Sequence, residues 1–170
     1  MRNKHLCLRL FAVSLMTVCL CASYSSPCFK ATAENYVEAK AECVMELNSR
    51  RVLYESHGDT RLPMASTTKI VTAATVLDNV PNLKEEVKIP AQAEGVEGSS
   101  VYLKAGDIYT VEELLYGLML RSGNDCGVAL ALHCSGSVAQ FATKMNETAQ
   151  KAGALASRFE NPHGDRKSVV

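Results

Sequence analysis

One stretch near the middle of the chain, LPMASTTKIVTAATVLDNV at residues 62–80, restricts the possible folds more than any other. Its apolar residues recur at the spacing of an α-helix, which predicts a helix from Ser66 onward with one buried face. The residues expected on that face are Ile70, Ala73, Ala74 and Leu77. Pro63 lies just upstream, where a helix entrance tolerates proline. Other elements must therefore pack over this helix.

A lysine stands in the first turn of the predicted helix, where the positive end of the helix dipole disfavours a cation. Lys69 follows Ser66 by three residues, so the two side chains share one helical face. A serine hydroxyl becomes a nucleophile when a base removes its proton, and a lysine is such a base when burial or a helix N-terminus destabilises its charge. The same helix end offers N–H groups to an oxyanion. The simpler interpretation is an N-cap serine with a solvated lysine, because Ser-x-x-Lys occurs by chance about once per few hundred residues.

The first 33 residues have the layout of a secretory signal peptide. Three basic residues precede an apolar run at 10–21, and Ala31-Thr32-Ala33 forms a cleavage site of small residues. The run is too short to span a bilayer comfortably, so a retained membrane anchor is the weaker alternative. We therefore expect residues 1–33 to be removed and the protein to be exported.

The overall composition excludes some classes of partner. Lysine plus arginine and aspartate plus glutamate both number 18, and aromatic residues make up only 6% of the chain. We therefore expect no nucleic-acid partner, since such a protein needs a basic surface or a stacking platform for bases. Nothing in the sequence calls for a cofactor.

Three cysteines remain after the predicted cleavage: Cys43, Cys126 and Cys134. An odd number cannot all pair within one chain. Cys126 and Cys134 are expected on one helix, about 12 Å apart by helical rise, which is too far for a disulfide. His133 beside Cys134 would suit a metal site, but no second Cys-x-x-Cys or His-x-x-x-His pattern supports one. We expect buried free thiols and no metal.

Periodicity and turn residues predict both strands and helices. Residues 41–47 alternate like a half-buried strand with Cys43 on its buried side, and residues 51–56 would complete a hairpin. Residues 80–109 contain several prolines and glycines and are expected to be irregular. Capping patterns then predict three helices: one from a Thr110–Glu113 capping box, one over 125–133, and one from Ser137 to Lys151. Together these elements predict an α+β fold.

The triplet Ser122-Gly123-Asn124 falls between two predicted helices, where a loop can project a hydroxyl and an amide into a cleft. A plainer interpretation is a helix end followed by an Asn that caps the next helix. Ser-x-x-Lys with Ser-Asp-Asn and Lys-Thr-Gly is the set of motifs in class A β-lactamases and penicillin-binding proteins. The first two motifs of this chain are similar to that set.

Four stretches make the resemblance specific: PMASTTKIVTA (63–73), GSSVYLKAGD (98–107), VEELLYGLMLRSGNDC (111–126) and FENPHG (159–164). In this order the chain resembles the serine D-alanyl-D-alanine carboxypeptidases, the low-molecular-mass penicillin-binding proteins, over nearly all of residues 41–164. The resemblance implies the fold of β-lactamases and DD-peptidases, an antiparallel sheet with a helical cluster, here incomplete. Residues 34–164 would be the N-terminal part of the catalytic domain, and residues 165–170 a tail outside the family pattern.

The same resemblance implies roles for four residues. Ser66 would be the acylated nucleophile, with its N–H in the oxyanion hole, and Lys69 the general base. Ser122 would relay a proton to the leaving group, and Asn124 would hold the substrate amide and position Lys69. His163, in FENPHG, is expected to be structural. The implied substrate is a peptidoglycan stem peptide ending in D-Ala-D-Ala, with β-lactams as inhibitors, at the cell envelope or outside the cell.

The family's third motif, Lys-Thr-Gly or a variant, does not follow Ser122 in these 170 residues. That motif would carry the second oxyanion donor and a cationic group for the substrate carboxylate, so we expect impaired catalysis in this chain. Two alternatives stay open. One is a non-catalytic fragment or binding protein on the same scaffold. The other is a relative of class A β-lactamases, although Gly123 stands where their motif has Asp.

Overall fold

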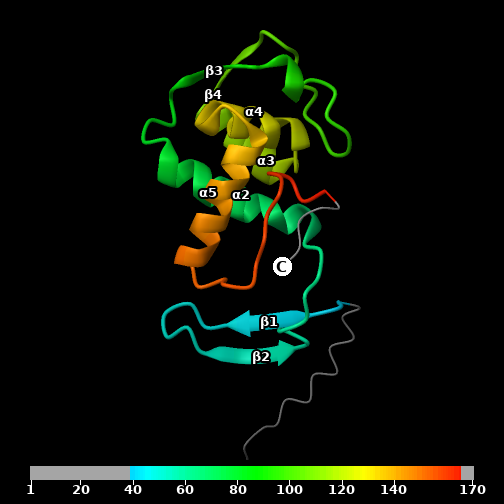
Figure 1. The fold of residues 1–170 in the computed structure, drawn as a ribbon, viewed down its shortest axis with the longest axis vertical. Helices are drawn as coiled ribbons and strands as arrows, with labels where there is room; N and C mark the ends of the chain where they lie inside the picture. Colours follow the sequence, from blue (N-terminus) through cyan, green and yellow to red (C-terminus); the bar gives the residue numbers. More distant parts are fainter. Residues whose placement is uncertain (1–38, 166–170) are drawn as a thin grey trace, which may run out of the picture. The chain divides into compact units, whose positions relative to one another are not determined.

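The computed structural model describes residues 39–165 (Figure 1). The predicted signal peptide (1–33) lies outside the described residues, as does the predicted tail after Asp165. The chain divides into two units after Lys40, and every described helix and strand belongs to the second unit. These elements are, in order, β1 (Glu42–Met45), β2 (Val52–Ser56), the 3₁₀ helix η1 (Ala65–Thr67), α2 (Thr68–Asn79), β3 (Glu86–Lys88), the 3₁₀ helix η2 (Ala91–Ala93), β4 (Ile108–Thr110), α3 (Val111–Leu120), α4 (Asn124–Ser135) and α5 (Val138–Lys151). They confirm the predicted α+β fold.

The described strands form two separate antiparallel pairs. The predicted hairpin is confirmed as β1–β2, in which Glu42 lies opposite Ser56. Its predicted burial is wrong, because Cys43 and most of the apolar residues of both strands are exposed, and no further described strand joins this sheet. The residues of the second pair, β3–β4, lie within the range 80–109 that was expected to be irregular, except for Thr110 at the end of β4. Strands of three residues are too short to produce a recognisable alternation.

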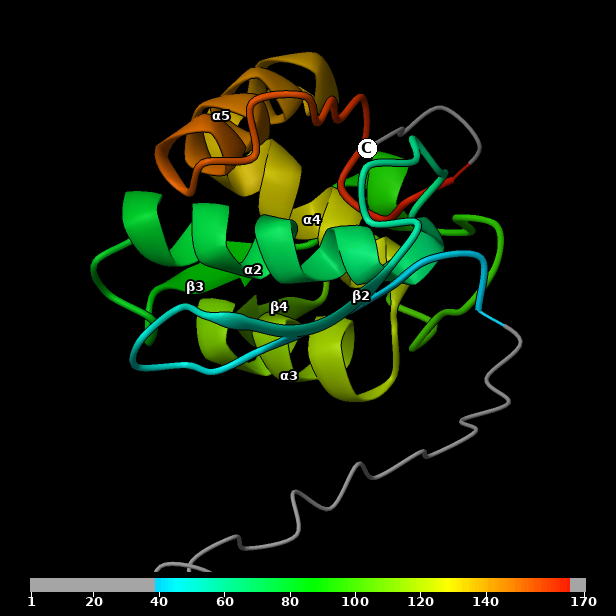
Figure 2. The ribbon, with the colours of Figure 1, turned by 90° about the horizontal axis from the view of Figure 1, so that it is seen from below.

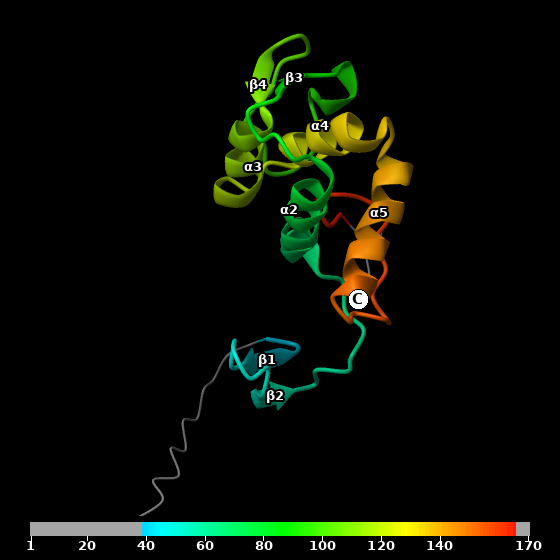
Figure 3. The same cartoon turned by 90° about the vertical axis from the view of Figure 1, so that its left-hand side faces the viewer.

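Helix α2 contacts α3, α4 and α5 and lies between α3 and α5 (Figures 2 and 3). The predicted buried face of α2 is wrong at Ile70 and Leu77, which are 61% and 54% exposed, whereas Ala73 and Ala74 are half-buried. The buried residues are instead Thr68, Lys69, Thr72, Thr75 and Val76. Two of the threonines satisfy their hydroxyls internally: Thr72 Oγ1 donates to the Pro162 carbonyl at 2.7 Å, and Thr75 Oγ1 donates to the Val71 carbonyl at 2.8 Å. Hydrogen-bonded hydroxyls can be buried at little cost, so hydrophobic periodicity alone misplaced the face.

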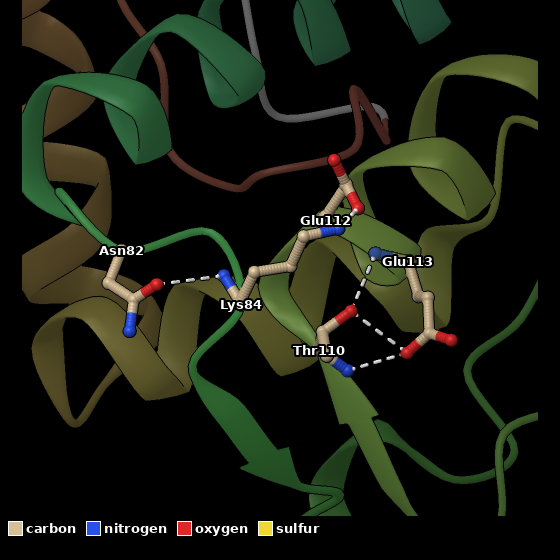
Figure 4. A network of polar contacts seen from close by, with 5 residues as sticks. All are labelled: Asn82, Lys84, Thr110, Glu112 and Glu113. Carbon is tan, nitrogen blue, oxygen red and sulfur yellow. Dashed lines mark hydrogen bonds and ion pairs between the residues drawn. The ribbon is translucent and has the colours of Figure 1, made fainter.

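Helix α3 begins with the predicted capping box, which is confirmed (Figure 4). Thr110 Oγ1 accepts a hydrogen bond from the Glu113 N–H, and the Glu113 carboxylate accepts one from the Thr110 N–H. The Val111 N–H donates to the Glu85 carbonyl, and the Glu112 N–H donates to the Leu83 carbonyl. Lys84 forms an ion pair with Glu112, and its own N–H donates to the Asn82 side chain (Figure 4). The first turn of α3 is therefore tied to the segment that leads into β3.

The cysteines of α4 are free thiols, as expected. Cys126 is buried and Cys134 is half-buried. Burial raises the pKa of the Cys126 thiol to about 12 and that of the Cys134 thiol to about 11, so both are protonated at neutral pH. His133 lies 3.4 Å from the Glu85 carboxylate, and no group of three or more His, Cys, Asp or Glu within residues 39–165 is placed to hold a metal.

In the part of the chain that the structure describes, no helix combines the length and the apolar character needed to cross a membrane.

Candidate active site

The four residues singled out from the sequence meet around the end of one side chain. Lys69 Nζ lies 3.0 Å from Ser66 Oγ, 3.0 Å from Ser122 Oγ and 2.7 Å from Asn124 Oδ1. Ser122 Oγ in turn donates to Ser66 Oγ at 3.1 Å. These residues come from η1, α2, the α3–α4 junction and the first position of α4. The structure therefore brings all four predicted residues into one hydrogen-bonded cluster.

Ser66 is not an N-cap, which excludes the simpler interpretation of the Ser-x-x-Lys motif. The predicted helix begins with the 3₁₀ turn η1, and α2 starts at Thr68 after an N-cap at Thr67 that makes no side-chain capping bond. The Ser66 hydroxyl is hydrogen-bonded to Lys69 and Ser122 instead. The residue before it, Ala65, has φ 47°, a left-handed conformation that costs a non-glycine residue about 1–2 kcal/mol. Such strain is typical of functional sites.

The junction between α3 and α4 places Ser122 and Asn124 side by side. Ser122 also has a left-handed backbone, with φ 55°. Asn124 is held at both ends of its amide: Oδ1 accepts from Lys69, and Nδ2 donates to the Glu97 carbonyl at 2.7 Å. Its backbone N–H donates to the Ser99 carbonyl, also at 2.7 Å. Gly98 approaches so closely that a Cβ there would lie 2.6 Å from Asn124 Nδ2.

Lys69 is buried, with only 3% of its surface exposed, and its described hydrogen-bond partners carry no charge. Burial disfavours the ammonium form, so the pKa of Lys69 is lowered from its ordinary value. At a given pH, Lys69 is therefore a neutral amine that can accept a proton in a larger fraction of the molecules than an exposed lysine would be. This arrangement can activate the Ser66 hydroxyl beside it.

A cavity of about 780 Å³ opens over Ser66 and Asn124. Its other walls are residues 96–99 and residues 163–165. His163 was expected to be structural, and it forms part of this wall. Burial, with a contribution from the charge of Lys69, lowers the pKa of His163, so its imidazole is neutral at neutral pH. Among the residues that line this cavity, Ser66, Glu97, Ser99, Asn124, His163 and Asp165 have polar side chains.

The segment that carries His163 packs tightly against η1, the turn just before α2. Gly164 has φ 86°, and a Cβ at this position would lie 1.8 Å from the Ala65 carbonyl oxygen. Asn161 stabilises this turn by accepting hydrogen bonds from the N–H groups of His163 and Gly164. No role for Gly164 was predicted from the sequence, although it belongs to the stretch FENPHG that resembles the family. The backbone next to Ser66 therefore packs against Gly164, a residue almost a hundred positions later in the sequence.

Comparison with known proteins places the chain in a family. The family model of D-alanyl-D-alanine carboxypeptidase matches residues 29–168. A relative, the D-alanyl-D-alanine carboxypeptidase DacF of Bacillus subtilis, is 35% identical over 139 residues, which are 79% of this chain and 36% of that protein. The chain belongs to the D-alanyl-D-alanine carboxypeptidase family, as its motifs predict.

Solved structures of the family share the fold. The D-alanyl-D-alanine carboxypeptidase DacD of Francisella tularensis matches with a TM-score of 0.75 and 30% identity over 79% of this chain and 34% of that one. Penicillin binding protein 5 of Haemophilus influenzae matches with a TM-score of 0.72 and 31% identity over 77% of this chain and 41% of that one. The chain thus spans between about a third and two fifths of the length of these proteins.

The contact between Gly164 and Ala65 predicts that Gly164→Ala is unusually costly. A matched control is Gly153→Ala, because Gly153 has a similar φ of 89° but no atom within 4 Å of the position that a Cβ would take. We expect Gly153→Ala to lower the free energy of unfolding by about 1 kcal/mol through backbone strain alone. Gly164→Ala should lower it by about 2–4 kcal/mol, because overpacking is added. Urea unfolding of both variants measures the difference, and equal effects would contradict the described contact.

Proposed function

We propose that the protein is a serine D-alanyl-D-alanine carboxypeptidase in which Ser66 is the nucleophile and Lys69 is its general base. The observation that carries this proposal is the 3.0 Å approach of the buried Lys69 amine to the Ser66 hydroxyl. The names of the relatives support the reaction and suggest a substrate that ends in D-Ala-D-Ala, for which we propose a peptidoglycan stem peptide. Because the chain spans only part of these relatives, turnover of this substrate is proposed for the whole protein.

The proposed reaction begins when neutral Lys69 removes the proton of the Ser66 hydroxyl. Ser66 Oγ attacks the carbonyl carbon between the two D-alanines and forms a tetrahedral oxyanion. Ser122, hydrogen-bonded to both residues, passes the proton from Lys69 to the nitrogen of the departing D-alanine. The C–N bond breaks and leaves an ester on Ser66, which water hydrolyses to restore the serine. Asn124 holds the substrate amide and keeps Lys69 in place.

A β-lactam undergoes only the acylation step of this reaction, because opening of its ring amide leaves a stable ester on the serine. Because the third motif does not follow Ser122 in these 170 residues, we expect a fluorescent penicillin to label Ser66 only slowly, over prolonged incubation, as located by mass spectrometry of the peptides. Ser66→Ala should abolish the label. Lys69→Ala should slow labelling by about 10²–10⁴-fold, which is the usual contribution of a general base.

The matched control is Lys88→Ala, which removes an exposed lysine from β3. It should label at the rate of the unmodified protein. A label on another serine, or a label that survives Lys69→Ala at full rate, would contradict the proposed roles.

We also propose that the protein is exported and acts at the cell envelope or outside the cell. The basic start, the apolar run at 10–21 and the site Ala31-Thr32-Ala33 support removal of residues 1–33. N-terminal sequencing of the protein recovered from the envelope fraction should then begin at Glu34. An intact Met1 on that protein would indicate a retained anchor.

A further inference from the structure

Asp125 is a buried carboxylate for which the proposed reaction has no use. It is the second residue of α4, directly after Asn124, and only 1% of its surface is exposed. Burial would raise the pKa of Asp125, but hydrogen bonds, first from Ser100 and then from backbone N–H groups, outweigh burial and lower it. Asp125 is therefore ionised at neutral pH, although a buried charge is costly unless it is paired or hydrogen-bonded.

The hydrogen bonds of Asp125 come mainly from one segment, residues 100–103. Oδ2 accepts from Ser100 Oγ at 2.6 Å, from the Val101 N–H at 3.1 Å and from the Leu103 N–H at 3.1 Å. Oδ1 accepts from the N–H of Cys126 on the same helix at 3.0 Å. Hydrogen bonds to a charged acceptor are about twice as strong as neutral ones. The carboxylate therefore fastens residues 100–103 to the start of α4.

The fastened segment would not hold this shape by itself. Tyr102 has φ 63° although its side chain is 82% exposed, so no packing of the ring explains its left-handed backbone. Its N–H donates to Ser100 Oγ, the same hydroxyl that donates to Asp125. A left-handed conformation costs a non-glycine residue about 1–2 kcal/mol, and the hydrogen bonds around Asp125 offset that cost.

The residues just before this segment form one wall of the active-site cavity. Glu97, Gly98 and Ser99 line it together with Ser66. The carbonyls of Glu97 and Ser99 accept the two hydrogen bonds that orient Asn124, and Asn124 Oδ1 accepts from Lys69. Asp125 is thus linked to Lys69 through hydrogen bonds to residues 100–103, the backbone that joins them to residues 97–99, and the hydrogen bonds of Asn124. Asp125 itself is not among the residues that line the cavity.

We propose that Asp125 is a positioning residue of the active site, whose carboxylate fixes residues 97–103 and the Asn124 amide so that Lys69 is shielded from water and directed at Ser66. This role rests on the proposed function, because it concerns the same site. Asp125 acts through the cavity wall and makes no hydrogen bond to Lys69.

The test is an NMR pH titration of the full chain with ¹³C-labelled lysine, in which the Lys69 Cε signal is assigned by its loss in Lys69→Arg. Asp125→Asn loosens the cavity wall and admits water to Lys69, so the pKa of Lys69 should rise toward its ordinary value. A direct electrostatic role predicts the opposite sign, because removing an anion makes a nearby cation less stable. Burial, with a contribution from the charge of Lys69, lowers the pKa of His163, so this neighbouring imidazole is neutral at and above neutral pH.

Two further variants keep the proposal testable if Asp125→Asn does not fold. Ser100→Ala removes one hydrogen bond from the carboxylate and should raise the pKa of Lys69 by a smaller amount, whereas Ser100→Thr keeps the hydroxyl and should restore it. Asp78→Asn, at an exposed position of α2, removes the same charge and should leave the pKa of Lys69 unchanged.

Amide exchange at Val101 and Leu103 should become about tenfold to a hundredfold faster in Asp125→Asn.

A fall or no change in the pKa of Lys69 in Asp125→Asn and Ser100→Ala would overturn the proposal, even if both variants were less stable. The titration needs no reaction, so it separates the two hypotheses. If penicillin labels Lys69→Ala at Ser66 as fast as the unmodified protein but Lys69 shifts as expected, the proposed function is wrong and the positioning role stands. If Ser66 reacts and Lys69 does not shift, the positioning role alone is wrong.

Discussion

The burial of the Lys69 amine among uncharged hydrogen-bond partners is the interaction on which the site depends. Removing an ammonium from water costs several kcal/mol unless an opposite charge accompanies it. The described partners of Lys69 are two hydroxyls and an amide, so the side chain is held in place without an anion that would fix its proton. The backbone is left-handed at Ala65, next to Ser66, and at Ser122 itself, and the carbonyls of Glu97 and Ser99 in the cavity wall orient Asn124.

Much of this site could be predicted from the sequence because the relevant residues conflict with local preferences. A lysine in the first turn of a helix opposes the helix dipole, and such conflicts are expected mainly at functional positions. The capping box at Thr110 and the cap at Ser137 obey local rules, which is why α3 and α5 were predicted with correct starts. Ser122 and Asn124 were identified because their spacing, together with that of Ser66 and Lys69, resembles a known set of motifs.

The remaining features depend on contacts that single-chain patterns do not encode. Helix α2 buries threonines rather than Ile70 and Leu77, because hydroxyls that donate to Pro162 and Val71 carbonyls are satisfied inside the protein. No role was predicted for Asp125, because three of its four hydrogen-bond donors come from residues 22 to 25 positions earlier. Gly164 matters because the Ala65 carbonyl lies against it. The three-residue strands β3 and β4 left no periodicity to detect.

The central claim is that neutral Lys69 is the base that activates Ser66, and the pH dependence of Ser66 acylation by penicillin tests it most directly. The rate should increase with pH as Lys69 loses its proton. The pH at which the rate increases should lie below the pH range in which lysine ordinarily titrates, because burial lowers the pKa of Lys69. Lys69→Arg keeps a cation and its donors but cannot lose its proton, so Ser66 should stay unreactive at every pH. Retained acylation in Lys69→Arg, or a rate in the unmodified protein that does not change with pH, would contradict the account.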